Sequence, residues 1–269
     1  MKVSVTAVCA FFEHSRQALF KSQRRAVKTF MEEQLIISEV KRIRKELSKV
    51  GTRKLLFDLQ RLGFDIGRDR LFNLLRKENM LVKRKKKGPH TTYSKHWFRK
   101  YTNLIRGVKL TAPNQVFVSD ITYLRVLGGF VYLSLVTDAY SRKIVGWHLS
   151  KSLGVEGPLE ALKMALKNVP HPEGLIHHSD RGIQYCCKEY VKVLLDHHVL
   201  ISMTEENHCY ENALAERVNG ILKDEFLLGE TLPSFNVAKE LTRDSIYNYN
   251  HLRRHCSLNL KTPAEVHNV

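Results

Sequence analysis

The hydrophobic pattern of this chain changes its period at about residue 114. Through residues 32–80, apolar side chains recur every three or four positions, as they do on one face of an α-helix. The stretch NQVFVSDITYLRV, residues 114–126, instead alternates apolar and polar side chains, which is the period of a β-strand. Since a pattern written for one period does not suit the other, the chain must hold an all-α part followed by a part built on a sheet.

The second part predicts a mixed sheet of five strands. Its first three strands follow one another directly, and Gly128-Gly129 predicts the first hairpin turn. Predicted helices and strands then alternate, which places helices on both faces, the first strand in mid-sheet and the fourth strand beside it. The expected elements are strands 114–126, 130–140 and 143–150, helix 156–169, strand 174–182, helix 187–199, strand 200–205 and helix 210–226.

The first part predicts several short helices. Three of them, the last one basic, are typical of a helix-turn-helix or winged-helix DNA reader, although a generic three-helix bundle would show the same pattern. Arg68 and Arg70 point outward from the last helix and are candidate DNA contacts. The expected elements are a short helical pair over 3–21, with Ser15 as an N-cap, and helices over 32–49, 52–64 and 67–80.

Charge is divided unevenly along the chain. Residues 1–110 hold 28 Lys and Arg against 9 Asp and Glu, whereas residues 111–269 hold 16 against 18. This asymmetry predicts a phosphate-binding module joined to a nearly neutral domain. A solubilising basic tail is the alternative, and the regular apolar spacing of the first half argues against it.

A basic stretch, LVKRKKKGPHTTYSKH, marks a boundary between the two parts. It is suited to following phosphates, and it is equally compatible with a solvated run of charge. The stretch after it, residues 97–107, predicts a short amphipathic helix. Its candidate DNA contacts are Lys83, Arg84, Lys85, Lys86 and Lys87. The expected division is a short helix-turn-helix-like helical segment at 1–30, a basic helix-turn-helix or winged-helix-like region at 31–88, a linker at 89–113 and an α/β catalytic core at 114–269.

Three acidic residues stand where the expected topology brings distant segments together. Asp120 lies in the first strand, Asp180 ends the fourth, and Glu216 lies on the last helix, which crosses that edge. Adjacent carboxylates raise each other's pKa, so such a cluster is unfavourable unless cations bind to it. Mg²⁺ prefers hard oxygen ligands, and two such ions about 3.5–4 Å apart can hold the attacking and leaving oxygens of a phosphoryl transfer.

One face of the last predicted helix extends this site. Residues 212, 216, 219 or 220, and 223 share that face at helical spacing. On this interpretation Glu216 binds metal, Gly220 lets a DNA backbone approach, and Lys223 reaches a phosphate about 10 Å further along.

Several stretches carry a resemblance to a known family. They are VSDITYLR, YLSLVTDAYSRKIVGWHL, HHSDRGIQY, ENALAERVNGILKDE and YNHLRRHCSLNLKTPAEV, within residues 114–267. Together they resemble the DDE transposases of insertion-sequence family three, OrfB type, which are related to retroviral integrases. The basic region GTRKLLFDLQ…GRDRLFNLL…LVKRKK is similar to the helix-turn-helix segment that precedes the core in that family.

This resemblance implies an RNase H-like fold in which Asp120, Asp180 and Glu216 form the acidic triad and Lys223 contacts DNA. It also implies Mg²⁺ or Mn²⁺, recognition of terminal inverted repeats, and cleavage of one strand to give a 3′-hydroxyl that attacks DNA directly. The expected partners are double-stranded DNA and further copies of the chain, since two ends must be brought together. The sequence lacks a convincing leucine-zipper heptad, so an OrfA partner or fusion is a further expectation.

Smaller interpretations concern the neighbours of the acidic residues. Arg142, Arg181 and Arg217 either contact DNA or pair with a nearby carboxylate. Asp138 is a turn cap or a fourth ligand, with the cap favoured. His177 and His178 are interpreted as wall residues of the site.

Two rival functions remain open at this point. An RNase H-like nuclease or junction resolvase would use the same carboxylates without joining strands, and a non-catalytic DNA-binding regulator would use only the basic part. No run of about 18 apolar residues predicts a membrane span. The five cysteines are odd in number and form no CxxC pair, which fits a reducing cytoplasm. The family resemblance implies a bacterial cytoplasm and an association with the nucleoid.

Overall fold

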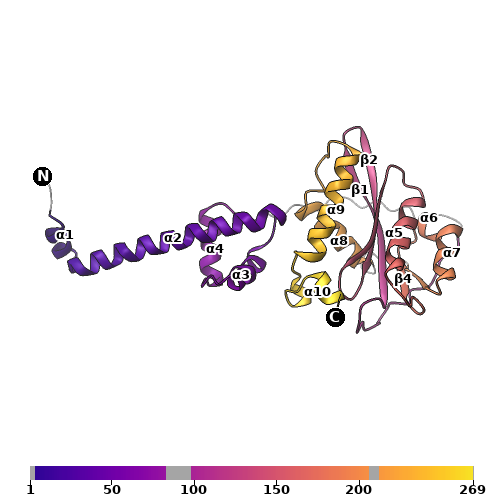
Figure 1. Cartoon of the computed structure of the whole chain (residues 1–269), viewed down its shortest axis with the longest axis horizontal. Coiled ribbons are helices and arrows are strands. Elements are labelled where there is room, and N and C mark those ends of the chain that lie inside the picture. Colours follow the sequence, from indigo (N-terminus) through magenta and orange to yellow (C-terminus); the bar gives the residue numbers. More distant parts are fainter. Residues whose placement is uncertain (1–3, 83–97, 206–211, 269) are drawn as a thin grey trace. The chain divides into compact units, whose positions relative to one another are not determined.

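The computed structural model describes residues 4–82, 98–205 and 212–268 (Figure 1). Its contacts divide the chain into two units. We call Met1–Glu46 with Val50–Val82 the helical unit, and Leu47–Lys49 with Lys83–Val269 the core.

In the described part of the helical unit, residues 4–46 and 50–82, the helices are α1 (Val5–Phe11), α2 (Arg16–Glu46), α3 (Thr52–Arg61) and α4 (Arg68–Lys77). Leu55, Leu59, Leu71 and Leu75 are fully buried and form an apolar core of α3 and α4, to which α2 adds buried residues such as Val40. Gly63 follows the C-terminal end of α3 and helps to terminate the helix. Its φ is +88°, a value that residues with a side chain rarely adopt.

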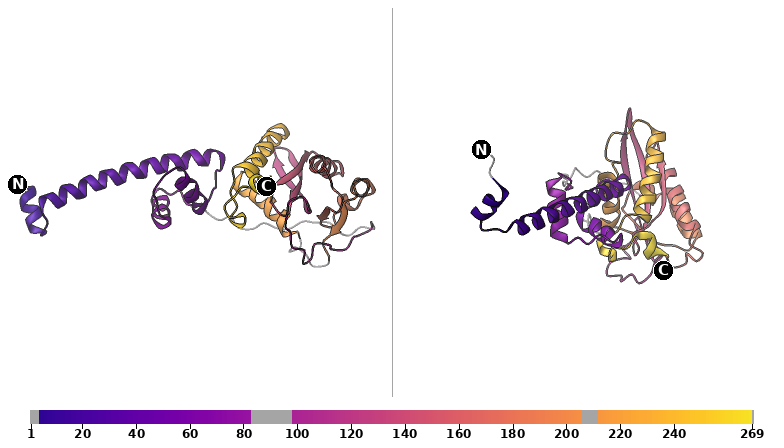
Figure 2. Two further views of the ribbon diagram at one scale, coloured as in Figure 1. Left: turned by 60° about the horizontal axis from the view of Figure 1, so that its bottom comes forward. Right: turned by 60° about the vertical axis from the view of Figure 1, so that its left-hand side comes forward.

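The predicted break between a helical pair at 3–21 and a helix at 32–49 is wrong. Residues 16–46 form one continuous helix of 31 residues, α2, which is unbroken in two further views (Figure 2). The expected division at residue 30 therefore falls inside a helix. Neither Gly nor Pro occurs between residues 16 and 46, so nothing in the backbone chemistry stops the helix there. In the N-terminal half of α2 the apolar side chains of Phe20, Val27 and Phe30 are exposed.

The core is built on a mixed sheet of five strands, as the sequence predicts. The strands are β1 (Val116–Val126), β2 (Gly129–Asp138), β3 (Ile144–Ser150), β4 (Ile176–Ser179) and β5 (Leu200–Met203). Their order is β3-β2-β1-β4-β5. The three N-terminal strands are antiparallel, while β4 lies parallel to β1 and β5 parallel to β4. β1 is thus central and has β4 as its neighbour, and this arrangement positions the site.

Helices cover both faces of this sheet (Figure 1). On one face, α5 and α7 pack with buried residues such as Phe117 and Val136, and on the other α8 and α9 pack with residues such as Leu133 and Leu135. The helices of the core are α5 (Glu156–Lys167), α6 (Ile183–Cys186), α7 (Lys188–Asp196), α8 (Ala213–Glu225), α9 (Phe235–His251), the 3₁₀ turn η1 (Cys256–Leu258) and α10 (Pro263–His267).

The short helix predicted over 97–107 does not form in its described part. Residues 98–107 instead lie along the core without regular structure. The amide of Leu104 donates to Ser202 Oγ (2.8 Å) and that of Asn103 to Glu205 Oε1 (3.2 Å). The side chain of Asn103 also accepts from the amide of Ile105 (3.0 Å). These side-chain partners satisfy amides that a helix would have used, so the segment is docked without being helical.

Candidate active site

Strand β1 presents Asp120 toward α8. Side chains alternate along a strand, and Val116 and Val118 pack with Ala215 of α8. Asp120 is the next residue on that face, and its backbone lies opposite Leu135 of β2. The strand period therefore directs this carboxylate to the helix that carries Glu216.

Strand β4 brings Asp180 beside Asp120. The parallel register pairs Val118 with His178, so two residues further along both strands it leads to Asp120 and Asp180. Asp180 follows the last residue of β4, where its Oδ1 accepts from the amide of Gly182 at 2.9 Å. The tight turn at the strand end holds this carboxylate in place.

Helix α8 contributes a direct hydrogen bond to the site. Asn219, one turn after Glu216, donates from Nδ2 to Asp120 Oδ2 at 2.7 Å. At the N-terminal end of the helix, Asn212 Nδ2 donates to the carbonyl of Ser119 at 3.3 Å. Two asparagines on one face therefore fix α8 to β1 at the level of Asp120. Sequence reasoning gave Asn219 no role, although its position three residues after Glu216 was a usable signal.

The environment of Asp120 raises its pKa to about 7. Burial is the largest cause and the charge of Asp180 the second, while hydrogen bonds from Asn219 and the Ile121 amide act in the opposite direction. The charge of Glu216 adds a smaller increase. The three predicted acidic residues thus interact, with Asp120 at their centre. Within the described ranges they do not form a preorganised group of three ligands, and no other His, Cys, Asp or Glu residues there do so.

Lys223 extends this site along α8. Its ammonium lies 4.3 Å from the ring centroid of Tyr123. Burial lowers its pKa, while the negative charge of Asp120 opposes that change. Lys223 is therefore within electrostatic reach of the acidic residues, two turns from Glu216.

A buried polar network lies behind the acidic residues. His177 Nε2 is 2.8 Å from Ser119 Oγ and 2.9 Å from Tyr190 OH. Burial lowers the pKa of His177 to about 3, which keeps the imidazole neutral at physiological pH. His178 Nδ1 lies 2.8 Å from Ser202 Oγ. Both histidines are thus buried residues that join β4 to its neighbours through one ring nitrogen each, in agreement with their interpretation as wall residues.

Asp138 is a turn cap, as favoured from the sequence. Its carboxylate accepts from the amide and the hydroxyl of Ser141 at 2.7 and 2.6 Å and from the amide of Asn114 at 2.7 Å. These bonds close the turn between β2 and β3, where Arg142 adopts a φ of +67°. The carboxylate is fully buried, so it is a structural group.

The remaining basic candidates lie in different settings. Arg142 is partly buried and its pKa is lowered by that burial, Arg181 is partly buried after Asp180, and Arg217 is exposed beside Glu216. In the helical unit Arg68 pairs with Asp69 at 2.9 Å and Arg70 with Glu32 at 3.3 Å. Lys83, Arg84, Lys85, Lys86 and Lys87 lie outside the described residues.

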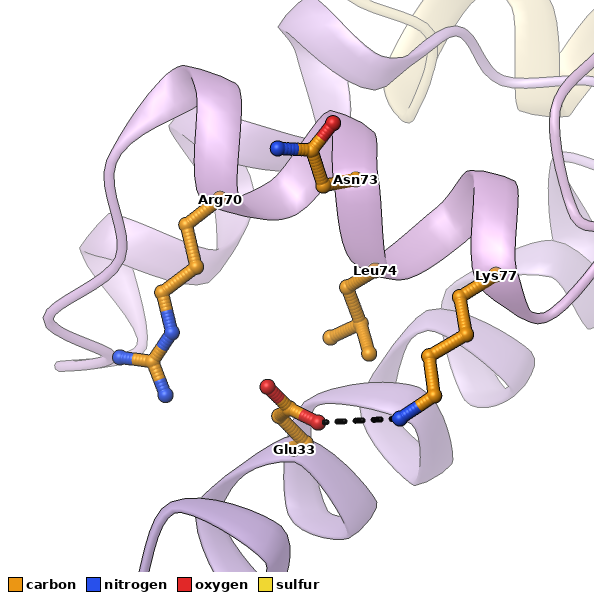
Figure 3. Close-up of a pocket in the computed structure, with 5 residues that line it drawn as sticks. All are labelled: Glu33, Arg70, Asn73, Leu74 and Lys77. Carbon is orange, nitrogen blue, oxygen red and sulfur yellow. Dashed lines mark ion pairs between the residues drawn. The ribbon is translucent and has the colours of Figure 1, made fainter. Parts of the chain in front are cut away.

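A hollow of about 400 Å³ opens between α2 and α4 of the helical unit. In Figure 3, Arg70 and Lys77 flank Leu74 while Glu33 faces them from α2, and the Lys77 ammonium lies 3.9 Å from Glu33. Asn73 completes the lining. The basic face of α4 is therefore partly compensated by α2.

Family models locate the same core. Residues 111–209 match a family described as "Integrase core domain", and residues 197–263 match a second model with that description. A 31 kDa protein of insertion element IS600 from Shigella sonnei is 38% identical over 80% of this chain and 79% of its own length. Transposase InsF for insertion sequence IS3A from Escherichia coli K12 is 31% identical over 82% of this chain and 77% of its own length. The chain belongs to the IS3 family of DDE transposases. The transposase is accordingly a polynucleotidyl transferase of DNA transposition, and its core is RNase H-like.

Solved integrases resemble the transposase more distantly. The HTLV-2 integrase catalytic core domain in complex with magnesium is 20% identical, with a TM-score of 0.46 over 58% of this chain and 97% of that chain. A chain of the simian T-cell lymphotropic virus intasome in complex with PP2A regulatory subunit B56 gamma is 19% identical, with a TM-score of 0.49 over 82% of this chain and 72% of that chain. At such TM-scores the likeness carries no argument about the site. Among the described helices of the transposase, none has the length and apolar character that crossing a membrane requires.

Proposed function

We propose that this transposase binds the terminal inverted repeats of its insertion sequence, cuts one strand at each end and joins the new 3′-hydroxyl to DNA. The observation that supports the proposal is the electrostatic interaction of Asp120 with Asp180 and Glu216, which come from elements that are distant in the chain. In the first step water attacks a phosphodiester and a 3′-hydroxyl leaves. In the second, that 3′-oxygen attacks another phosphodiester, whose own 3′-oxygen leaves with the proton. Both steps place extra charge on phosphate oxygens, so one site can serve both.

We infer that Asp120, Asp180 and Glu216 hold two Mg²⁺ or Mn²⁺ ions. The donor set fits, since all three side chains offer the hard oxygens that these cations prefer. The raised pKa of Asp120 reflects a buried carboxylate near other negative charge, which is the situation that a divalent cation relieves. Bound there, such ions would stabilise the phosphate and lower the pKa of the attacking hydroxyl.

The chain's own side chains would orient the reactants. Asn219 restrains Asp120 through the 2.7 Å hydrogen bond to its Oδ2. Lys223 carries a positive charge close to Asp120 that a phosphate oxygen of the bound strand can meet. Arg217 and Arg181, which directly follow two of the acidic residues, and Arg142 are further proposed DNA contacts.

The basic first part of the chain would supply most of the affinity for DNA. Arg68 and Arg70 on α4 are proposed contacts, together with the basic run at 83–87. We propose that residues 1–88 serve recognition, residues 89–113 linkage and residues 114–269 catalysis. Because two transposon ends must be joined, we also propose a homo-oligomer on DNA, with OrfA as a partner or fusion.

Three conservative substitutions test this function. Asp120→Asn, Asp180→Asn and Glu216→Gln each remove a charge while keeping the shape, and each should lower strand cleavage and joining by at least about a hundredfold. Binding to a labelled transposon end should survive, because the basic part is unchanged.

The control in the same assay is Glu240→Gln, an exposed glutamate of α9. Cleavage at the wild-type rate by any of the three variants would show that the substituted residue is not part of the catalytic site. Cleavage by the wild type without joining of a labelled 3′-hydroxyl would favour the nuclease or resolvase function instead.

A further inference from the structure

The outer half of the β1–β2 ribbon carries an exposed aromatic pair close to the acidic residues. Tyr123 and Phe130 are 44% and 47% exposed, large fractions for rings of their size. They meet edge to face, with ring centroids 5.4 Å apart. Aromatic side chains on a sheet are normally covered by a helix. These two rings remain at the surface, where a planar group of a binding partner can stack on them.

Two cations accompany this pair. The ammonium of Lys223 lies 4.3 Å from the Tyr123 ring centroid, and the guanidinium of Arg125 lies 5.8 Å from that of Phe130. Aromatic faces combined with positive charge are the features by which proteins hold single-stranded nucleic acid: the bases stack on the rings and the phosphates meet the cations.

The position of the pair connects it to the acidic site. β4 pairs with β1 only through residues 116–118, so the ribbon projects past Asp120 without a β4 neighbour. Tyr123 follows Asp120 by three residues, which is about 10 Å along a strand, so alternation starts its side chain on the opposite face of β1. Lys223 acts on both, because its charge interacts with Asp120 and its ammonium covers part of the Tyr123 ring. A DNA strand held at the acidic residues would pass the aromatic pair within a few nucleotides.

The outer ribbon is held firmly in this position. The amide of Leu232 donates to the carbonyl of Arg125 and the amide of Leu127 to the carbonyl of Leu232, both at 2.9 Å. The amide of Gly229 donates to the carbonyl of Lys223 at 3.1 Å. The loop after α8 therefore joins the helix that carries Lys223 to the ribbon that carries the rings. A preformed surface of this kind costs little ordering on binding.

We propose that Tyr123 and Phe130, with Lys223 and Arg125, form a stacking site for unpaired bases of the DNA strand beside the acidic residues. This inference rests on the proposed function, since it assigns part of the strand that the site would cut. It adds a specific preference for an opened DNA end over a fully paired one.

The test uses the full chain and two DNA probes in buffer with EDTA, so that no cleavage takes place. One probe is a duplex with a short single-stranded tail that carries 2-aminopurine, and the other is the same duplex with a paired, blunt end. Stacking should quench 2-aminopurine fluorescence in the tailed probe on binding. Tyr123→Leu and Phe130→Leu should each weaken tailed binding by about tenfold and reduce the quench, while blunt binding stays unchanged. Tyr123→Phe, which keeps the ring, should behave as the wild type.

The matched control is Tyr247→Leu, since Tyr247 is an exposed aromatic of the same core that stacks on His251. Wild-type affinity and wild-type fluorescence quenching in both leucine variants would contradict the stacking site. An equal loss of affinity for the tailed and the blunt probe would contradict it as well. Thermal unfolding of each variant separates a folding defect from lost stacking. Because no step needs catalysis, this outcome is independent of whether the transposase joins strands.

Discussion

The charged pairs of the helical unit and the acidic residues of the core differ in their exposure to solvent. In the helical unit, charged pairs such as Arg68–Asp69 and Arg70–Glu32 are exposed to solvent. Exposed pairs of this kind contribute about 0–1 kcal/mol. In the core, Asp120 is partly buried, restrained by one asparagine and repelled by two carboxylates.

This difference indicates that DNA recognition and catalysis depend on different kinds of charged group. A surplus of surface charge gives attraction for phosphates over a broad area at little cost in stability. A buried carboxylate near like charges costs stability, and its retention marks a site that binds something to offset it. The net positive charge of the helical unit thus indicates DNA affinity there, and the raised pKa of Asp120 indicates that catalysis takes place in the core.

The largest effect expected from this comparison is a stabilisation of the core by Asp120→Asn. The pKa of Asp120 is about 7 when folded against an ordinary value of 3.8. Between those values the folded state holds a proton that the unfolded state lacks, so stability falls as the pH rises through this window. Asparagine does not ionise. In EDTA at about pH 8, the free energy of unfolding of the variant should therefore be about 2 kcal/mol higher than that of the wild type. A difference of three pKa units corresponds to roughly 4 kcal/mol, of which this is a part.

At about pH 4, below the folded pKa, the two proteins should be nearly equal in stability. Asp69→Asn is the matched change in the helical unit and should alter stability by less than about 0.5 kcal/mol at either pH. Chemical unfolding at the two pH values measures both. Equal destabilisation by Asp120→Asn at both would show that its hydrogen bonds dominate, and the contrast between the units would fail.

A smaller effect is expected from the hollow between α2 and α4. Glu32 and Glu33 compensate Arg70 and Lys77, so the double variant Glu32→Gln, Glu33→Gln should release both cations for DNA. Affinity for duplex DNA should rise a few-fold at low salt and return to the wild-type value at high salt, while stability changes by less than about 0.5 kcal/mol. Titration against labelled duplex measures this effect. A gain no larger than that of Glu240→Gln would mean that α4 does not face DNA.

The sheet and the proximity of Asp120 to Asp180 were predictable from the sequence because strand periodicity is local. Alternation in 114–126 fixes which residues of β1 share a face, and the order of strands and helices fixes β4 as the neighbour of β1. Asp120 and Asp180 then come together through backbone pairing alone.

Other features depend on long-range contacts and were not predictable. α2 continues through residue 30 although its N-terminal half buries little, because the residues there favour a helix without tertiary support. Residues 98–107 are amphipathic, yet they dock through Ser202 and Glu205, which are about a hundred residues away. The bond from Asn219 to Asp120 likewise needs the packing of α8 on β1, which no local pattern specifies.

The most direct test of the central claim is a crystal structure of the transposase bound to a DNA end and Mn²⁺, with anomalous scattering to locate the metal. The account predicts two manganese peaks about 3.5–4 Å apart, with oxygens of Asp120, Asp180 and Glu216 as ligands and a DNA phosphate between the ions. Manganese bound elsewhere, or three carboxylates that remain apart with DNA in place, would contradict it.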